Sequence, residues 1–196
     1  MKYLLNVGCG APGGGGVPAW FENFREVRMD IDPGVAPDIL GDITDMSAVA
    51  DGVVDALWTA HCLEHLYQHQ LPRALAEIRR VLTDDGFGCL VVPDLQRIAE
   101  YVAQDRMHET VYESPAGPIT AHDIFFGHGP ALARGHLTMA HRCGFTPTLM
   151  VNALNQAGFG GYAVLRRPGF ELVAVVRRRD WGKAGEREAL LATLGL

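Results

Sequence analysis

Glycines and carboxylates near the amino terminus occur in an order that suits the binding of a nucleoside-containing cofactor. Six glycines fall within the nine residues from Gly8 to Gly16, directly after an apolar run over residues 3–7. Without a Cβ atom, glycine lets the chain turn sharply and bring backbone N–H groups close to a ligand. Asp30 ends a second apolar run, twenty residues after Gly10. A carboxylate in that position can accept hydrogen bonds from both hydroxyls of a ribose, so we expect the cofactor to lie across two parallel strands.

The same stretch reads GxGxxG over residues 8–13, but this match to the dinucleotide fingerprint is not specific. The fingerprint needs a helix whose amino terminus faces a pyrophosphate. Gly13–Gly16 and Pro18 prevent a helix before Ala19, and Trp20–Arg25 is too short for a long crossover helix. Two alternatives therefore stay open for this stretch: a surface loop of small residues and the nucleotide site of a nicotinamide-dependent oxidoreductase.

Composition and charge narrow the class of protein. The 196 residues are 48% hydrophobic and 20% charged, which predicts one globular domain over residues 1–196. A net charge of −6 argues against a general nucleic-acid binder. No apolar run reaches the roughly 18 residues that span a membrane. Widely spaced cysteines without a CxxC pair predict reduced thiols in a cytoplasmic protein. These are Cys9, Cys62, Cys89 and Cys143.

Apolar runs alternate with helical patterns, which predicts a mostly parallel sheet with helices on both faces. Strands are expected over residues 3–7, 27–31, 36–40, 53–60, 87–93, 162–166 and 170–176. Helices are expected over residues 70–82, 95–104 and 147–158. The last two strands are joined by only three residues and must be antiparallel. The predicted fold class is α/β, a Rossmann-like doubly wound sheet of about seven strands with an antiparallel C-terminal hairpin strand.

Residues 105–144 show little periodicity and are rich in histidine, glycine and proline. An irregular stretch of this length inside a compact domain is more often a functional lid than a passive connection. We therefore expect a lid or substrate insertion at about residues 105–144. Residues 184–194 have a helical pattern without an evident role, and are expected to cover a sheet edge or to join a partner.

Taken together, the motifs resemble those of the class I S-adenosylmethionine-dependent methyltransferases, in the type 11-like group related to ubiquinone-biosynthesis methyltransferases. LNVGCG at 5–10, MDIDP at 29–33, GDITDM at 41–46 and VVDALWTAHCLEHL at 53–66 are similar to the first four motifs of that family. The run at 74–93 is similar to the helix and strand that follow. The resemblance is close over residues 3–104 and holds in outline over 145–176. It implies S-adenosylmethionine as cofactor and S-adenosylhomocysteine as product.

The resemblance also implies roles for individual residues. Gly8 and Gly10 would let the backbone approach the methionine moiety. Asp30 would hold the ribose diol through charge-assisted hydrogen bonds, with Asp32 as the alternative. Asp42 would accept a hydrogen bond from the adenine amino group. The other positions assigned to the cofactor are Asn6, Cys9, Ile31, Ile43 (packed on the adenine ring), and Ala60 and His61 (at the sulfonium end).

The chain departs from the family pattern in three respects. Asn6 stands where the family has an acidic residue, and a neutral amide attracts the cationic cofactor less. The first crossover helix is shortened into the Gly13–Pro18 loop. The N-terminal helices that close the family's active site are missing, because the first strand starts at once. The 105–144 segment or a partner subunit is expected to take their place.

Histidines suggest two further kinds of chemistry. His61, His65 and His69 are spaced i, i+4, i+8, which on one continuous helix could form a metal site. The helix is expected to restart at residues 70–72, so no metal is predicted, and His65 and His69 are interpreted as a hydrogen-bonded core residue and a surface residue. In the 105–144 segment, His128 (flanked by glycines) and then His141 are the candidate catalytic bases. The alternative is that both histidines only hold the segment together. Phe125–Phe126 would supply the apolar wall of an acceptor pocket.

The resulting hypothesis is an S-adenosylmethionine-dependent methyltransferase acting on an oxygen or nitrogen atom of a small molecule. A non-catalytic cofactor-binding or regulatory protein of the same fold is the first alternative. An NAD-binding oxidoreductase is the second. A small-molecule substrate is expected, with neither nucleic acid nor a membrane as partner, and a homodimer is compatible with the sequence.

Overall fold

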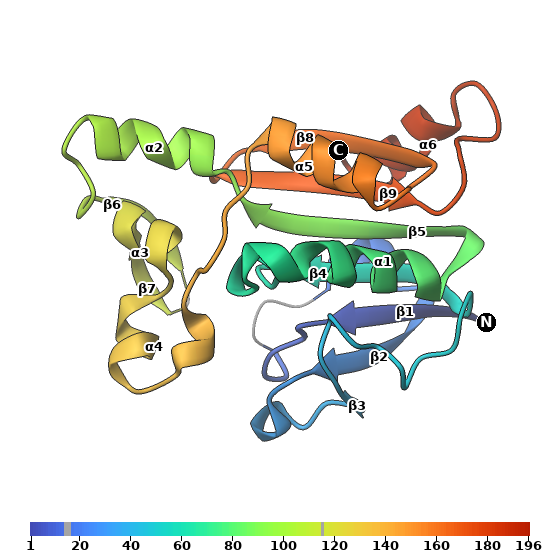
Figure 1. Cartoon of the computed structure of the whole chain (residues 1–196), viewed down its shortest axis with the longest axis horizontal. Coiled ribbons are helices and arrows are strands. Elements are labelled where there is room, and N and C mark those ends of the chain that lie inside the picture. Colours follow the sequence, from blue (N-terminus) through green and yellow to red (C-terminus); the bar gives the residue numbers. More distant parts are fainter. Residues whose placement is uncertain (14–16, 115) are drawn as a thin grey trace.

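A seven-stranded sheet forms the centre of the computed structural model, which describes residues 1–13, 17–114 and 116–196. The strand order is β3-β2-β1-β4-β5-β9-β8, and β9 runs in the opposite direction to the other six strands (Figure 1). The strands are β1 (Lys2–Val7), β2 (Phe24–Asp30), β3 (Ile39–Leu40), β4 (Val54–Ala60), β5 (Leu82–Pro93), β8 (Gly161–Arg167) and β9 (Glu171–Arg177). The predicted α/β sheet with a reversed C-terminal hairpin strand is confirmed.

Two helices cover one face of the sheet, α1 (Leu71–Val81) and α5 (Pro147–Gln156). Leu75 and Ile78 of α1 are fully buried in the main core, as their helical spacing predicted. Helix α5 begins where expected, because the Thr146 hydroxyl accepts a hydrogen bond from the Leu149 N–H at 3.2 Å and proline occupies the first turn. Regular amphipathic helices therefore form on this side as the sequence indicates.

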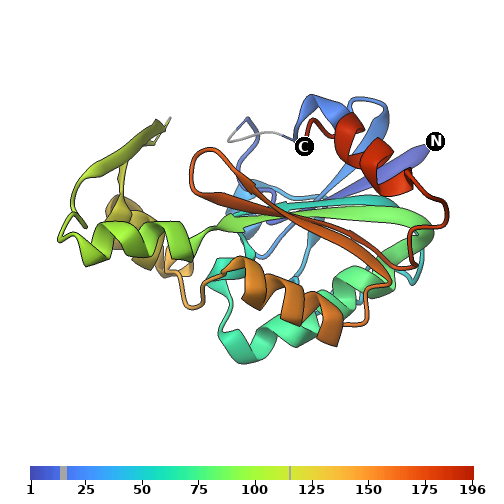
Figure 2. The same ribbon diagram turned by 90° about the horizontal axis from the view of Figure 1, so that it is seen from above.

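The other face is covered in an unusual way. Between β1 and β2 the described residues contain only a 3₁₀ turn, Ala19–Phe21, in place of a crossover helix. Helix α6 (Glu186–Thr193) from the C-terminal tail lies over this face beside the turn (Figure 2). Leu194 is 1% exposed, and it packs with a cluster of aromatic side chains. The tail thus covers a face of the sheet, whereas one alternative expected it to cover an edge. An apolar face of a sheet that lacks a covering helix must be shielded from water by another segment.

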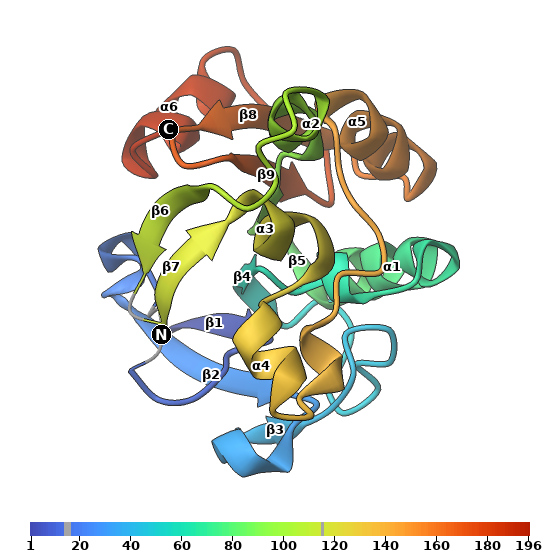
Figure 3. The same cartoon turned by 90° about the vertical axis from the view of Figure 1, so that its left-hand side faces the viewer.

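The 105–144 segment is more regular than expected. Helix α2 (Leu95–Ala103) leads into it, and it contains β6 (Thr110–Ser114), β7 (Gly117–Thr120), α3 (Ala121–Phe126) and α4 (Gly129–Ala133). These elements lie in front of the carboxyl ends of β1, β4 and β5 (Figure 3). They have a small core of their own, built on Ile98, Ala121 and Ile124. The prediction of an irregular stretch was wrong because elements this short contain too few repeats to show a periodicity.

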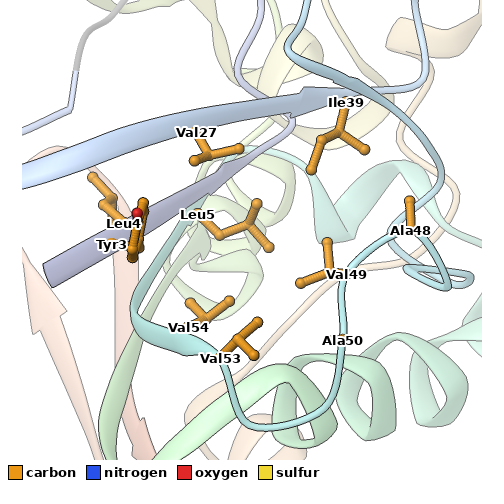
Figure 4. A pocket seen from close by; sticks show the side chains of 10 residues that line it. All are labelled: Tyr3, Leu4, Leu5, Val27, Ile39, Ala48, Val49, Ala50, Val53 and Val54. Carbon is orange, nitrogen blue, oxygen red and sulfur yellow. The ribbon is translucent and has the colours of Figure 1, made fainter.

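An apolar hollow of about 290 Å³ opens between β1, β2, β4 and the connection 41–53, which has no helix (Figure 4). Its lining includes Leu5, Val27, Ile39, Val49 and Val54, and it lies toward the amino ends of β1 and β4. Side chains of this kind offer no acid, base or ligand atom for chemistry. Separately, in the part of the chain that the structure describes, none of the helices is long and apolar enough to cross a membrane.

Packing of the C-terminal tail can be tested through Leu194. We expect Leu194→Ala to lower the free energy of unfolding by about 2–5 kcal/mol, because it leaves a cavity under α6. Urea unfolding followed by circular dichroism measures the change. Leu137→Ala is the matched control, because Leu137 is 67% exposed and its truncation should change stability by less than about 0.5 kcal/mol. Equally small effects of both substitutions would show that the tail does not pack on the sheet.

Candidate functional site

The glycine loop after β1 folds back onto the end of β2. Gly8 and Gly10 have φ angles of +71° and +60°, a left-handed conformation that favours glycine. The Gly8 N–H donates to the Met29 carbonyl at 2.9 Å, and the Gly10 N–H donates to Oδ2 of Asp30 at 2.9 Å. A Cβ on Gly8 would lie 2.9 Å from Sγ of Cys62, whereas a Cβ on Gly10 would meet open space. The loop is therefore closed toward β4 at Gly8 and open to a ligand at Gly10.

The two carboxylates after β2 differ in their roles. Asp30 turns toward the glycine loop, and its Oδ1 also accepts the Asp32 N–H at 3.0 Å. Asp32 is exposed and caps the 3₁₀ turn Pro33–Val35 by accepting the Gly34 N–H at 2.8 Å. Geometry therefore favours Asp30 over Asp32 for a ligand that lies along the loop. Ile31 between them is 59% exposed, which leaves an apolar side chain at this edge.

Glu26 and Arg28 belong to the site although neither was predicted. Asn6 is buried, and its Nδ2 donates to Oε1 of Glu26 at 2.7 Å, so a carboxylate stands beside the neutral amide. The Arg28 guanidinium donates to the Gly10 carbonyl and holds the loop. Burial raises the pKa of the Cys9 thiol, Arg28 lowers it, and Asp30 and Glu26 raise it further. The sequence could have indicated Glu26 and Arg28, because side chains alternate between the two faces of a strand and residues 26, 28 and 30 of β2 therefore share one face.

Asp42 and Ile43, at the beginning of the β3–β4 connection, face different surroundings. Oδ1 of Asp42 accepts hydrogen bonds from the N–H and the hydroxyl of Thr44, at 2.7 and 2.8 Å. Ile43 is only 5% exposed and lies in the main core with Val7 and Met29. The structure therefore does not support packing of the Ile43 side chain on an adenine ring. Ile31 presents the exposed apolar surface that such packing needs.

At the end of β4, a strained histidine joins two carboxylates. Half-buried Ala60 leads to His61, which has a φ of +51°, uncommon for a residue other than glycine. Nε2 of His61 lies 3.1 Å from Oε1 of Glu171, and Nδ1 lies 3.3 Å from Oε1 of Glu64. Burial lowers the pKa of His61, but the two carboxylates outweigh it and raise this pKa to about 10. The two carboxylates therefore favour the protonated form of the His61 ring.

Two more histidines approach this site. Nδ1 of His65 lies 3.2 Å from the Ala140 carbonyl, and Nδ1 of His141 lies 2.8 Å from the Ile124 carbonyl. A carbonyl only accepts, so each Nδ1 carries the proton and each Nε2 keeps its lone pair in the neutral ring. Burial, the largest effect, lowers the pKa of His141. The surface position predicted for His69 is confirmed, and 3₁₀ turns at Leu63–His65 and Gln68–Gln70 break the helical register of the three histidines.

A close backbone contact brings both predicted bases to one cavity. A Cβ on Gly127 would lie 2.1 Å from the Met139 carbonyl oxygen, so only glycine allows this approach. Beside it, the His141 N–H donates to the Phe126 carbonyl at 3.0 Å. His128 and His141 both line a cavity of about 140 Å³ between the 105–144 segment and the strand ends. Its other lining residues include His61, Glu64, His65, Pro93, Tyr112, Asp123 and Glu171.

Phe125 and Phe126 do not supply the predicted apolar wall of this cavity, because neither is among its lining residues. Phe125 packs on the small core of the 105–144 segment, and Phe126 is 48% exposed beside His122. The apolar part of the wall is formed by residues that the sequence did not single out, such as Tyr112, Ile119, Met139 and Phe170.

Comparison with known proteins gives this arrangement a context. Residues 5–90 match the family model described as a methyltransferase domain. A protein from Pyrococcus horikoshii has a similar structure, with 15% identity, a TM-score of 0.58, and coverage of 90% of this chain and 82% of that one. An S-adenosylmethionine-dependent methyltransferase from Thermotoga maritima has 14% identity, a TM-score of 0.57, and coverage of 91% and 83%.

A third similar structure contains ligands. It is the 1,6-didemethyltoxoflavin-N1-methyltransferase of Burkholderia thailandensis with bound 1,6-didemethyltoxoflavin and S-adenosylhomocysteine. It has 17% identity to this chain, a TM-score of 0.53, and coverage of 91% of this chain and 71% of that one. No curated protein sequence matches the chain significantly. Structural similarity at these levels of identity concerns the fold.

The assignment of the ribose carboxylate can be tested with paired substitutions. Asp30→Asn should weaken binding of S-adenosylhomocysteine by about 10- to 100-fold, because a charge-assisted hydrogen-bond pair loses its charge. Asp32→Asn, the matched control two residues away, should leave the affinity within about threefold. Isothermal titration calorimetry measures both dissociation constants. The reverse order of effects would assign the ribose to Asp32.

Proposed function

We propose that this protein, which matches a methyltransferase domain model over residues 5–90, is an S-adenosylmethionine-dependent methyltransferase that methylates an oxygen or nitrogen atom of a small-molecule acceptor. The observation that carries the acceptor proposal is the small cavity at the end of β4, lined by several titratable side chains. The nicotinamide alternative is disfavoured by the reversed strand β9 and by the lack of a crossover helix among the described residues between β1 and β2.

The residues at the ends of β1 and β2 fit the cofactor. The loop is open at Gly10, Asp30 offers carboxylate oxygens beside it, and Ile31 offers an exposed apolar side chain. We assign Asp30 to the ribose diol, Asp42 to the adenine amino group, and Gly8, Cys9 and Gly10 to the approach of the backbone. Glu26, which accepts a hydrogen bond from the neutral Asn6 amide, places a carboxylate near the loop, which favours a cationic ligand. When bound, S-adenosylmethionine supplies an electrophilic methyl group.

The acceptor would bind between the strand ends and the 105–144 segment, which would act as the lid. A cavity of about 140 Å³ suits a small molecule. The overall charge of −6 disfavours a polynucleotide acceptor. The related enzyme from Burkholderia thailandensis binds a small acceptor, which supports the same class here. Catalysis in such a site depends mostly on positioning of the acceptor against the methyl group, with a base where the acceptor must lose a proton.

His128 is the first candidate for this base and His141 is the second. His128 is half-buried, lines the cavity, and its side chain makes no helix-capping hydrogen bond at the start of α4. It would take the proton from the O–H or N–H group of the acceptor. His141 lines the same cavity, but its hydrogen bond to the Ile124 carbonyl also gives it a part in holding the segment together.

The class of acceptor can be tested without knowing its identity. The protein is incubated with S-adenosylmethionine carrying a trideuteromethyl group and with a cell extract separated into metabolite, protein and nucleic-acid fractions. We expect the label in the metabolite fraction by mass spectrometry, because only a small molecule fits the cavity. Label in the protein or nucleic-acid fraction would overturn the small-molecule proposal. No label in any fraction would favour the non-catalytic alternative.

The role of His128 has its own test. His128→Ala should lower kcat for the labelled acceptor by about 10²- to 10⁴-fold, the range for loss of a general base. The affinity for S-adenosylhomocysteine should not change. His136→Ala is the control, because His136 is an exposed histidine of the same segment that does not line the cavity. Wild-type kcat in His128→Ala would remove His128 from the reaction.

A further inference from the structure

Glu64, His65 and His141 form a cluster that the proposed reaction does not require. One ligand atom from each of these three residues lies within 4.8 Å of the others. Glu64 and His65 belong to the turn after β4, and His141 comes from the end of the 105–144 segment. All three line the cavity proposed for the acceptor.

The Glu64 carboxylate is the most unusual member of the cluster. It is 1% exposed, and neither of its oxygens has a hydrogen-bond partner among the residues that the structure describes. The contact of Oε1 with Nδ1 of His61, at 3.3 Å, is an ion pair without hydrogen-bond geometry. A buried carboxylate without partners is costly unless another group satisfies it. Oε2 therefore lacks a partner in a site where a cation would provide one.

Both histidines are oriented as metal ligands usually are. Nδ1 of His65 and Nδ1 of His141 are each held by a backbone carbonyl, at 3.2 and 2.8 Å. Metal-binding histidines typically donate one ring N–H to such an outer partner, which fixes the ring and presents the other nitrogen. The two rings are 4.9 Å apart between centroids.

The backbone also holds the cluster together. The Glu64 carbonyl accepts the N–H groups of Arg142 and Cys143, at 2.8 and 3.2 Å. The Arg142 guanidinium donates to the His65 carbonyl at 3.0 Å. These contacts join the turn after β4 to the segment that carries His141. The three side chains therefore converge through fixed main-chain bonds from two directions.

The contacts of His61 also leave one oxygen of Glu64 available for a cation. The His61 ring lies between two carboxylates, with Nδ1 3.3 Å from Oε1 of Glu64 and Nε2 3.1 Å from Oε1 of Glu171. A metal ion bound to Glu64 through Oε2 would therefore leave the contact between His61 and Glu171 in place.

We propose that Glu64, His65 and His141 bind a divalent transition-metal ion such as Zn²⁺ and leave open coordination positions toward the cavity. Two imidazoles and one carboxylate, with an open position, are the ligand set of many catalytic zinc and iron sites. Metal–ligand bonds of about 2.0–2.2 Å put neighbouring ligand atoms roughly 3–3.5 Å apart. Because the ligand atoms lie within 4.8 Å of one another, each side chain would move inward on binding by at most about 1 Å.

Resting on the proposed function, this site narrows the acceptor to a molecule with oxygen donors, such as a hydroxyl beside a second oxygen. A hydroxyl bound to the ion loses its proton more easily. The proton would pass to His128, since His141 is occupied as a ligand. The acceptor oxygen would then form its bond to the methyl carbon while the S–C bond breaks, and the electron pair of that bond stays on sulfur.

Metal binding by the full chain, prepared without a histidine tag, tests the site directly. Co²⁺ is titrated and its visible absorption bands are recorded, and Zn²⁺ is titrated by calorimetry. We expect one equivalent of metal per chain. Glu64→Gln and His141→Ala should each weaken binding by at least about tenfold. His69→Ala is the control, because His69 is a surface histidine stacked on Tyr67, and it should bind the metal like the wild type.

Separate readouts keep the site and the proposed function distinguishable. Unchanged affinity for S-adenosylhomocysteine shows that each variant is folded. No metal binding by the wild type, or equal binding by wild type, Glu64→Gln and His141→Ala, overturns the metal site. Labelling of a metabolite by metal-free protein, at the rate of metal-loaded protein, overturns the role in acceptor binding and leaves the methyltransferase proposal intact. Metal bound at these residues without labelling of any fraction supports the site and overturns the proposed function.

Discussion

The two hydrogen bonds accepted by the Glu64 carbonyl, from the N–H groups of Arg142 and Cys143, are the contacts on which the site depends. They fasten the end of the 105–144 segment to the turn after β4, where the carboxyl ends of the parallel strands meet. Ligand sites of open α/β sheets form at that edge because every parallel strand delivers its last residues there. Without this junction, the cavity would lose the wall that carries His128 and His141.

Negative charge is concentrated along the same edge. Glu26 and Asp30 lie at the glycine loop, Asp42 follows β3, and Glu64 and Glu171 flank His61. These carboxylates outnumber the nearby cationic groups Arg28 and His61, and an excess of one sign of charge attracts ligands of the opposite sign. This excess suits the cationic cofactor proposed for one end of the edge and the metal ion proposed for the other. It also explains how the neutral Asn6 can replace an acidic residue, since Glu26 on the neighbouring strand supplies the charge.

Coverage of the sheet shows how the chain compensates for a lost element. With no crossover helix between β1 and β2 in the described residues, the apolar face behind Leu4 and Trp58 would be open to water. The turn Ala19–Phe21 and the C-terminal helix α6 close it from opposite ends of the chain. That face is therefore buried by two segments from opposite ends of the chain, and the stability of the sheet depends on both segments.

Patterns within one element could be read from the sequence because they are local. The buried stripe of α1, the caps Asp94 and Thr146, and the short turn that reverses β9 all follow from spacing over a few residues. The glycines after the first strand and Asp30 at the end of the second indicated a nucleoside-containing cofactor in the same way, whereas the role of Asp42 was implied only by the family resemblance. Even so, local pattern did not reveal that Ile43 turns into the core while Ile31 stays exposed.

Only the tertiary structure decided which distant residues meet. The helix α6 could have covered an edge, a face or a partner, and packing against the aromatic cluster determined the face. Glu64 and His65 lie close to His141 because the backbone at Gly127 approaches the Met139 carbonyl more closely than a Cβ atom would permit. An amino-acid pattern specifies which side of a short element is apolar, whereas such encounters depend on the summed packing of the whole chain. For that reason the glycine loop after β1 was predictable, and the histidine–carboxylate cluster was not.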